Sequence, residues 1–265
     1  MNENISRRRL IWTGVAAAGA AGLGGAALFA KRVGLIPPDS HGLLGVGETL
    51  TYATQRLLVS EKTMAREFNR SEISSFAPIK GNPPENEMYE RLRAKDFADW
   101  RLSVGGLVSR ATSFSLDELK RMPAENHVFL QACEEGWSFI AEWGGVPLHH
   151  VLNLVGVLPQ ARYVVFFGYD INYDAPNARD IRGKWNSIDM SDAWHPQTLL
   201  AYSMNGLGEL PVEHGAPLRV RVPRQLGNKS VKYLAKILLA DSVANIGMGL
   251  GSGGAERGYS WWSGI

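Results

Sequence analysis

Cys133 is the only thiol in this 265-residue sequence, and its position suggests a chemical role. A single cysteine excludes an intrachain disulfide, a CxxC redox pair and a cysteine-ligated iron–sulfur cluster. The residue follows an apolar run, 127–132, and precedes Gly136, so we expect it at a strand end or in a turn. Chemistry is frequently placed on such positions. The alternative is an inert core thiol, because free cysteine is among the most buried residue types.

Two acidic residues, Glu134 and Glu135, directly follow the cysteine. Repulsion between like charges raises the pKa of a thiol, which is unfavourable for a thiolate nucleophile. A bound cation removes this conflict, because a coordinated thiol loses its proton. A metal-bound thiolate therefore fits this sequence better than a cysteine protease does.

A second cluster combines basic and hydrogen-bonding side chains between residues 214 and 232. Its members are His214, Arg219, Arg221, Arg224, Asn228, Lys229, Ser230 and Lys232. Such side chains, together with backbone amides near Gly215 and Gly227, are suited to bind an anion. The spacing matches neither a Walker loop nor a dinucleotide fingerprint. A solvated strand edge is the alternative, and the alternation of Arg219 and Arg221 favours it.

The elements that position these clusters are short. A helix is expected over 51–68 and an irregular, proline-rich loop over 71–86, which is long enough to be a binding segment. A capping box at Ser115 and Glu118 starts a short helix, and Pro147 and Gly156 bracket another. Strands are expected at 127–132, 162–167, 200–204, 218–222 and 233–240, with a strand–turn–strand at 101–108. The mixture predicts an α+β fold with mixed sheets.

The N-terminus has the layout of an export signal. Arg7, Arg8 and Arg9 precede an uncharged run, 10–30, rich in alanine and glycine, which is typical of the twin-arginine route. A transmembrane anchor is the alternative. Because a clean cleavage motif is not evident before Lys31, the segment is also expected to serve as an uncleaved tether.

Charge and length complete the domain prediction. We assign 1–32 to the signal or tether, 33–50 to a linker and 51–265 to one domain. The whole chain has a net charge of +2, while residues 33–265 carry 23 basic and 25 acidic residues. This balance gives no footprint for nucleic-acid binding, which requires clustered basic residues.

Several ordered blocks of the sequence resemble the sulfite-oxidase family of molybdenum enzymes, in particular its exported bacterial branch. These blocks are 133–138 (CEEGWS), 143–148 (WGGVPL), 187–190 (SIDM), 195–202 (HPQTLLAY), 204–206 (MNG), 210–211 (LP), 214–219 (HGAPLR) and 258–265 (GYSWWSGI). Glu134 departs from the pattern, because that branch has valine there. The resemblance implies the molybdopterin-binding fold of the family over most of 50–265.

The resemblance also implies a cofactor and its contacts. The cofactor is molybdopterin without an attached nucleotide, and Cys133 is its protein ligand to molybdenum. Glu135 matches an acidic position near the metal, suited to orient a water ligand or relay a proton. The remaining positions match contacts to the pterin or its phosphate: His214, Arg219, Ser230 and Lys232, with Lys229 and Arg224 as neighbours.

The expected activity is oxygen-atom transfer, in the direction that reduces an S-oxide or N-oxide of a small molecule or a protein. A membrane cytochrome b-type donor is expected to supply electrons to a periplasmic protein. Sulfite dehydrogenase is the first alternative. It is disfavoured because sulfite oxidases carry a Cys-Ala-Gly-Asn-Arg pattern, whereas the acids after Cys133 repel a dianion. A non-catalytic exported binding protein is the second alternative, and the intact cysteine argues against it.

Overall fold

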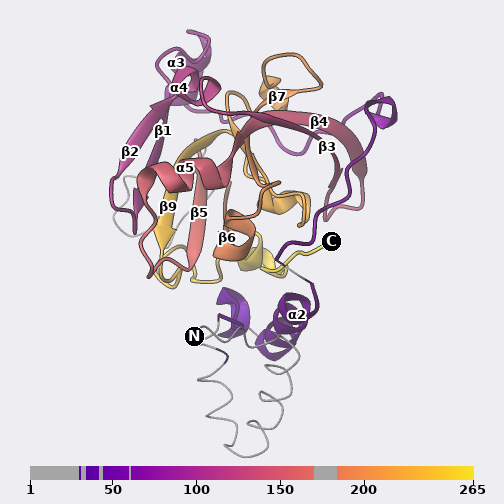
Figure 1. Ribbon diagram of the computed structural model, residues 1–265, viewed down its shortest axis with the longest axis vertical. Coiled ribbons are helices and arrows are strands. Elements are labelled where there is room, and N and C mark those ends of the chain that lie inside the picture. Colours follow the sequence, from indigo (N-terminus) through magenta and orange to yellow (C-terminus); the bar gives the residue numbers. More distant parts are fainter. Residues whose placement is uncertain (1–29, 31–33, 42–43, 60, 170–183) are drawn as a thin grey trace, which may run out of the picture.

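The computed structural model describes residues 30, 34–41, 44–59, 61–169 and 184–265. Within these residues the chain forms two sheets with a few short helices around them (Figure 1). The first sheet has the order β2 (Thr112–Ser115), β1 (Arg101–Gly106), β9 (Leu234–Ala240), β5 (Tyr163–Gly168) and β6 (Trp185–Asp189). The second has the order β3 (Glu125–Ala132), β4 (Ser138–Pro147), β7 (Leu199–Met204) and β8 (Arg219–Arg221).

Both sheets are largely antiparallel, and one parallel pair joins strands from opposite ends of the chain. β3 and β4 form a long hairpin, with Ala132 opposite Ser138 next to its connecting loop. β1 pairs in parallel with β9, so the last strand lies between β1 and β5. The residues of the two expected chemical clusters therefore lie in loops and strand ends of a mixed α+β scaffold, as the sequence predicts.

The helices are short and lie around the sheets. The α-helices are α2 (Gly45–Leu58), α3 (Glu87–Arg93), α4 (Leu116–Lys120), α5 (Leu148–Val155) and α6 (Met190–Ala193). The 3-10 turns are η1 (Pro38–His41), η2 (Arg70–Glu72), η4 (Val212–His214), η5 (Gly227–Lys229) and η6 (Ala255–Arg257). In Figure 1, α2 lies at the end of the molecule opposite α3 and α4.

The main hydrophobic core lies between the two sheets. It contains Leu102 and Phe166 of the first sheet, Val146 and Val220 of the second, and Leu152 of α5, each essentially inaccessible to solvent. Burial of large aliphatic and aromatic side chains is the main favourable term in folding. Because both sheets share this core, the strand ends of the two sheets are held in fixed relative positions.

Local sequence signals predict several elements correctly. The Ser115 hydroxyl accepts from the Glu118 amide and the Glu118 carboxylate accepts from the Ser115 amide, which completes the expected capping box of α4. α5 follows Pro147 and ends at Gly156, whose φ of 68° is the left-handed conformation that favours glycine. The expected strands at 127–132, 162–167, 200–204, 218–222 and 233–240 correspond to β3, β5, β7, β8 and β9, with shifted ends.

Two expectations are wrong in detail. The segment expected as strand–turn–strand is a single strand, β1, because Gly105 and Gly106 pair with β9 instead of turning. A Cβ at Gly106 would lie 2.2 Å from the Leu239 carbonyl oxygen, so the glycine permits close strand approach. The helix expected over 51–68 is α2, which ends at Leu58. Residues 63–66 are not helical: the Ala65 backbone exchanges hydrogen bonds with the Gln197 side chain, and Glu67 forms a bridge with Phe129.

The export segment predicted over 1–32 lies outside the described residues, apart from Ala30. The stretch expected as a linker, 33–50, includes η1 and the first residues of α2. Among the residues that the structure describes, no helix has both the length and the apolar character needed to cross a bilayer.

Candidate functional site

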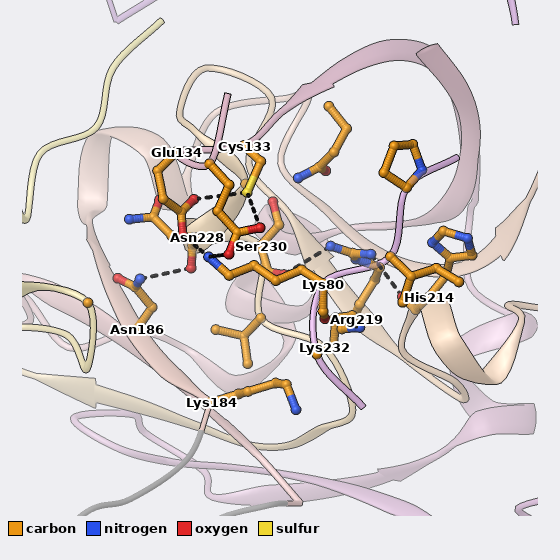
Figure 2. A pocket seen from close by; sticks show the side chains of 18 of the residues that line it. Lys80, Cys133, Glu134, Lys184, Asn186, His214, Arg219, Asn228, Ser230 and Lys232 are labelled. Atoms are coloured by element: carbon orange, nitrogen blue, oxygen red, sulfur yellow. Dashed lines mark hydrogen bonds and ion pairs between the residues drawn. The ribbon is translucent and has the colours of Figure 1, made fainter. Parts of the chain in front are cut away.

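Cys133 begins the loop that connects β3 to β4. Its amide donates to the Trp137 carbonyl (2.9 Å) and its carbonyl accepts from the Gly136 amide (3.1 Å). Gly136 has a φ of 91°, which an L side chain rarely adopts, so the turn depends on this glycine. The thiol is 7% exposed and lines a cavity of about 430 Å³ (Figure 2). The strand-end position expected from the sequence is thus correct, and the thiol faces a cavity instead of a closed core.

The two acids beside Cys133 share one cation. Cys133 Sγ lies 3.4 Å from a carboxylate oxygen of Glu134 and 4.0 Å from one of Glu135. Lys80, from the proline-rich loop, forms an ion pair with Glu134 and lies 3.2 Å from Glu135. Trp137 Nε1 also donates to Glu135 (3.0 Å). Two negative charges therefore flank the thiol, and a lysine distant in sequence compensates part of them.

Burial and the neighbouring charges set the protonation of this end. Burial raises the pKa of the Cys133 thiol, and the Glu134 charge adds to this increase, while the Glu135 amide and Lys80 oppose it; the net shift is upward. Burial by itself raises the pKa of Glu134. The hydrogen bond and the charge of Lys80 act in the opposite direction, and the net shift of the Glu134 pKa is downward. Bonds from Trp137 and Lys80 lower the pKa of Glu135. At neutral pH the acids are ionised while the metal-free thiol is protonated.

The opposite end of the cavity is cationic and is built on β8. Arg219 donates to the carbonyls of His214 (2.8 Å) and Ser230 (3.1 Å), which fixes its guanidinium beside the cavity. Lys232 Nζ donates to the carbonyls of Glu213 (2.7 Å) and Lys80 (2.9 Å). Figure 2 shows Arg219, Lys232 and His214 close together, with Lys80 reaching toward the acids.

Burial of these cations is costly. Arg219 and Arg221 are 5% and 1% exposed, and both guanidinium groups lie 4.9 Å from the ring centre of Trp143. Burial lowers the pKa of Arg219 to about 10 and lowers that of Arg221 as well. Among the described residues neither forms an ion pair with a carboxylate. The solvated strand edge considered from the alternating pattern is therefore wrong, because β8 is buried on both faces.

Burial and nearby cations also act on His214. Burial, followed by the charges of Arg219 and Lys232, lowers its pKa to about 4. The imidazole is therefore neutral at physiological pH, and its ring packs edge-on against Phe139 at 6.0 Å. It can offer one donor and one acceptor to a ligand without adding charge.

The donor and acceptor set of the cavity fits an anionic, polar organic cofactor. Arg219 Nε, Gln131 Oε1 and Asn228 Oδ1 are buried without a hydrogen-bond partner among the described residues. All three residues line the cavity. A Cβ on Gly227 would lie 2.1 Å from the Gln131 amide nitrogen, so a side chain there would displace the Gln131 amide from its position at the cavity. Uncompensated buried cations and unpaired polar atoms are costly unless a ligand satisfies them.

Six of the eight predicted site residues lie together at this cavity. They are Cys133, Glu135, His214, Arg219, Ser230 and Lys232. Ser230 lines the cavity, but its hydroxyl already accepts hydrogen bonds from Arg221 (2.8 Å) and from the Val222 amide (3.2 Å). The structure thus brings together residues from the β3–β4 loop and from the segment around β8.

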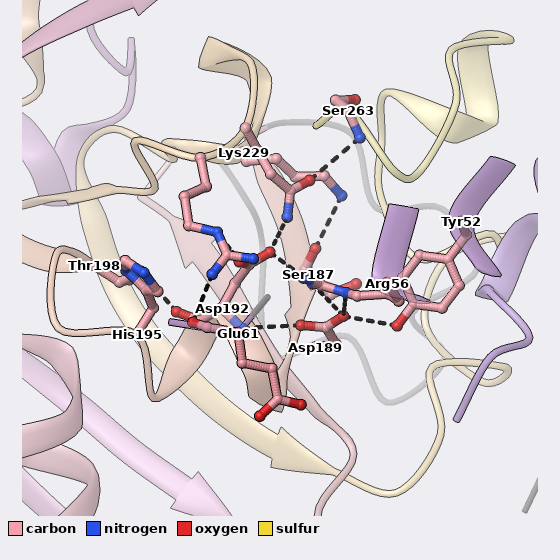
Figure 3. Close-up of polar contacts among 12 residues, drawn as sticks. Tyr52, Arg56, Glu61, Ser187, Asp189, Asp192, His195, Thr198, Lys229 and Ser263 are labelled. Atoms are coloured by element: carbon pink, nitrogen blue, oxygen red, sulfur yellow. Dashed lines mark hydrogen bonds and ion pairs between the residues drawn. The ribbon is translucent and has the colours of Figure 1, made fainter. Parts of the chain in front are cut away.

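Lys229 and Arg224 are buried and do not line the cavity. Figure 3 shows Lys229 within a network of buried polar side chains. Lys229 Nζ donates to Asn186 Oδ1 and the Ser187 carbonyl, both at 3.0 Å. Burial lowers its pKa to about 7. Arg224 donates to the Glu61 carbonyl (2.9 Å) and lies 3.4 Å from Asp192. These contacts hold neighbouring segments together, and the structure places both residues outside the cavity lining.

The network continues to α2. Arg56 pairs with Asp189 and, at 2.8 Å, with Asp192, and its guanidinium lies 3.9 Å from the ring centre of Trp262. Tyr52 donates to Asp189 at 2.7 Å. The Asp192 side chain is fully buried, so its charge depends on these partners. The network joins α2 to β6, and Asn186 of β6 lines the cavity.

Sequence reasoning missed several cavity residues. Lys80, Gln131, Asn186 and Asn228 line the cavity but were not among the predicted site residues. The unusual length of the irregular loop, 71–86, points to Lys80, and Asn228 belongs to the polar cluster at 214–232 without being assigned a contact. No local signal marks Gln131 and Asn186. Among the described residues, no group of three or more His, Cys, Asp or Glu could hold a metal. Cys133 is the single cysteine of the sequence and lines this cavity.

Comparison with known families agrees with this geometry. The family described as "Oxidoreductase molybdopterin binding domain" matches residues 89–245, more than half of the chain. The chain belongs to this family of molybdopterin-dependent oxidoreductases, and the α+β architecture described above is its fold. Molybdopterin is the class of cofactor that the cavity fits.

Curated relatives carry more specific names. The chain is 37% identical to "Putative protein-methionine-sulfoxide reductase subunit YedZ1" of Azospira oryzae, over 68% of this chain and 63% of that protein. It is 36% identical to "Protein-methionine-sulfoxide reductase catalytic subunit MsrP" of Xanthomonas axonopodis pv. citri, over 54% of this chain and 46% of that protein. The chain thus spans about half to two thirds of these relatives. The sulfane dehydrogenase SoxCD of Paracoccus pantotrophus is 26% identical with a TM-score of 0.47, covering 55% of this chain and 39% of that chain.

The depressed pKa of His214 makes stability depend on pH. Its folded pKa of about 4 lies below the ordinary value of 6.5, so only the unfolded chain binds a proton between these values. Stability is therefore complete above pH 6.5 and falls as the pH decreases toward 4. The His214→Gln variant should show a shallower loss between pH 7 and pH 5 in urea unfolding. His195, whose pKa burial also lowers to about 4, should retain its own contribution in this variant. Equal slopes for wild type and variant would contradict the assignment.

Removal of the α2 cation should be strongly destabilising. The Arg56→Met variant leaves the buried Asp192 carboxylate with one fewer cationic partner, and we expect a loss of about 3 kcal/mol in the free energy of unfolding. The matched control is Arg101→Met, because Arg101 pairs with Glu118 on the surface. This control should lose less than about 1 kcal/mol. Urea denaturation of both variants measures the difference, and equal losses would argue against a stabilising network.

Proposed function

We propose that this protein is an exported molybdopterin-dependent oxidoreductase that catalyses oxygen-atom transfer, reducing an S-oxide or an N-oxide. The observation that carries the proposal is the polarity of one cavity. A lone thiol, Cys133, lies at one end, and the other end is cationic, with the buried Arg219 forming no ion pair to a carboxylate among the described residues. A cofactor with a soft-metal centre and an anionic tail satisfies both ends.

The residues present fit molybdopterin. Cys133 is the side chain available as protein ligand to the metal, and Arg219 and Lys232 would bind the anionic end. His214, Gln131 and Asn228 offer neutral polar atoms along the cavity. When bound, the cofactor supplies the redox-active metal centre for oxygen transfer. We propose the form without an attached nucleotide, because the sequence blocks resemble a branch that uses it.

Glu135 would act at the open mouth of the cavity. Its side chain is 46% exposed, and bonds from Trp137 and Lys80 orient it. Because its pKa is lowered, it is ionised at neutral pH and accepts hydrogen bonds instead of donating them. This favours a role in orienting water or a protonated group, and in receiving a proton, over that of a general acid.

The charges near Cys133 indicate the kind of substrate. Glu134 and Glu135 outweigh Lys80, so this end of the cavity carries net negative charge. Such a field repels a dianion such as sulfite and admits a neutral sulfoxide or N-oxide. The names of the relatives, which refer to protein-methionine-sulfoxide reductase, support an S-oxide on a small molecule or a protein as substrate and the reductive direction.

We also propose the route and the partner. The paired arginines and the uncharged run at 10–30 support export through the twin-arginine route to the periplasm, with the segment retained as a tether if it is not cleaved. That route suits a protein that is loaded with its cofactor before export. A membrane cytochrome b-type protein would then supply the electrons.

The Cys133→Ser variant tests the proposal. Serine keeps the size and polarity of the side chain but removes the soft sulfur ligand, so turnover should fall by at least about 1,000-fold. The assay follows oxidation of a reduced viologen dye by methyl sulfoxides and by an N-oxide, using protein purified after native export. Molybdenum content, measured on the same samples, should be near one per wild-type chain and lower in the variant. The Arg110→Gln variant, altered on the surface, should match wild type in both measurements.

Two outcomes would redirect the assignment. Saturable sulfite oxidation by the molybdenum-loaded protein, without sulfoxide reduction, would favour a sulfite dehydrogenase. Wild-type protein without molybdenum would favour a binding protein that uses the fold without redox chemistry. Unchanged sulfoxide turnover in Cys133→Ser would contradict the role given to the thiol.

A further inference from the structure

The segment 78–82 forms one wall of the cavity without belonging to a helix or strand. Pro78, Ile79, Lys80 and Gly81 line the cavity. The flanking chain is firmly attached. On one side Ser74 exchanges hydrogen bonds with Ile140 of β4 (3.0 and 2.9 Å), and on the other Asn86 caps α3. Regular secondary structure is absent from residues 75–85, all of which the structure describes.

Three lysine side chains hold this wall in place. Lys80 Nζ reaches from the segment to the carboxylates of Glu134 and Glu135 beside Cys133. In the opposite direction, Lys232 Nζ donates to the Lys80 carbonyl (2.9 Å), and Lys184 Nζ donates to the Asn82 carbonyl (3.1 Å). The segment thus crosses from the acidic end of the cavity to its cationic end and is bonded to both.

The Lys80–Glu134 pair is the contact most able to govern this arrangement. Ordering an irregular segment costs conformational entropy at every residue, so the few contacts that hold it are decisive. The Glu134 side chain is only 10% exposed, whereas that of Lys80 is 43% exposed. Loss of Lys80 would leave a mostly buried carboxylate poorly compensated, which makes this pair stronger than an ordinary surface ion pair.

We propose that Lys80 and Glu134 form a clasp that closes segment 78–82 over the cavity and retains the cofactor there. Both are positioning residues: the pair fixes the wall beside Cys133, and the wall limits escape of the bound group. A ligand that fills the cavity contacts segment 78–82, and the clasp opposes the movement of the segment that would break these contacts. The proposal rests on the proposed function, since the retained group is molybdopterin.

The test compares Lys80→Met and Glu134→Gln, which remove one charge each at nearly constant size. The full-length protein, purified after native export, is cleaved by thermolysin, and the rate of cutting within 76–82 reports local opening of the segment. In parallel, the molybdenum-to-protein ratio is followed during dialysis. Both variants should be cut about fivefold faster and lose molybdenum about fivefold faster than wild type, the scale expected for a partly buried ion pair. The urea midpoint of global unfolding should fall only slightly, because the same small loss of free energy is a minor part of the global stability.

Matched variants separate the clasp from a general effect of charge. Lys80→Arg keeps the cation and should remain close to wild type in both rates. Lys95→Met breaks an exposed pair with Asp99 far from the cavity in sequence and should also match wild type. The double variant Lys80→Met/Glu134→Gln should be no faster than either single variant, because both changes remove one interaction.

Each result decides between the possibilities. Wild-type cutting rates in both single variants, or Lys80→Arg behaving like Lys80→Met, would overturn the clasp. Faster cutting with unchanged molybdenum loss would overturn its role in retention. If wild-type protein carries no molybdenum, the proposed function fails, and the cutting rates alone then support or overturn the closure of the segment by Lys80 and Glu134.

Discussion

Burial of positive charge behind one cavity is the constraint on which the site depends. Arg219 and Arg221 point from the short strand β8 into protein that holds no acidic partner for them among the described residues. Their guanidinium groups are held by carbonyls, by the Ser230 hydroxyl and by the face of Trp143. Such an arrangement is costly in a folded chain, and an anionic cofactor offsets the cost. The charge distribution is therefore organised for a ligand and not for stability.

The opposite end of the cavity carries an excess of negative charge beside a buried thiol. The loop after β3 places a thiol beside two carboxylates, and burial further disfavours the thiolate. A metal cation removes this cost by binding the sulfur as thiolate. Lys80 reduces the excess negative charge without occupying the position of the thiol. The two ends are electrostatically opposite, and in the proposed complex they would favour the metal of the cofactor near Cys133 and its anionic end near β8.

A buried polar network connects the cavity to helix α2. Lys229 and Arg224 belong to a buried network that reaches Arg56 of α2, so the helix that follows the N-terminal segment is tied to the strand that carries Asn186. Residues of one basic stretch thus divide into two groups. One group faces the cofactor cavity, and the other connects the cavity wall to the outer helix.

The sequence by itself determined several local elements of the fold and the charge of one segment. The capping box at Ser115, the helix between Pro147 and Gly156, the strand before Cys133 and the cationic character of 214–232 all follow from short-range rules, because neighbouring residues suffice to satisfy them. Tertiary structure decided which cations face the cavity, the burial of Arg219 and Arg221, and the arrival of Lys80 beside Glu134. These outcomes depend on how two sheets and a long irregular segment pack, since burial and ion pairing are set by residues far apart in the chain.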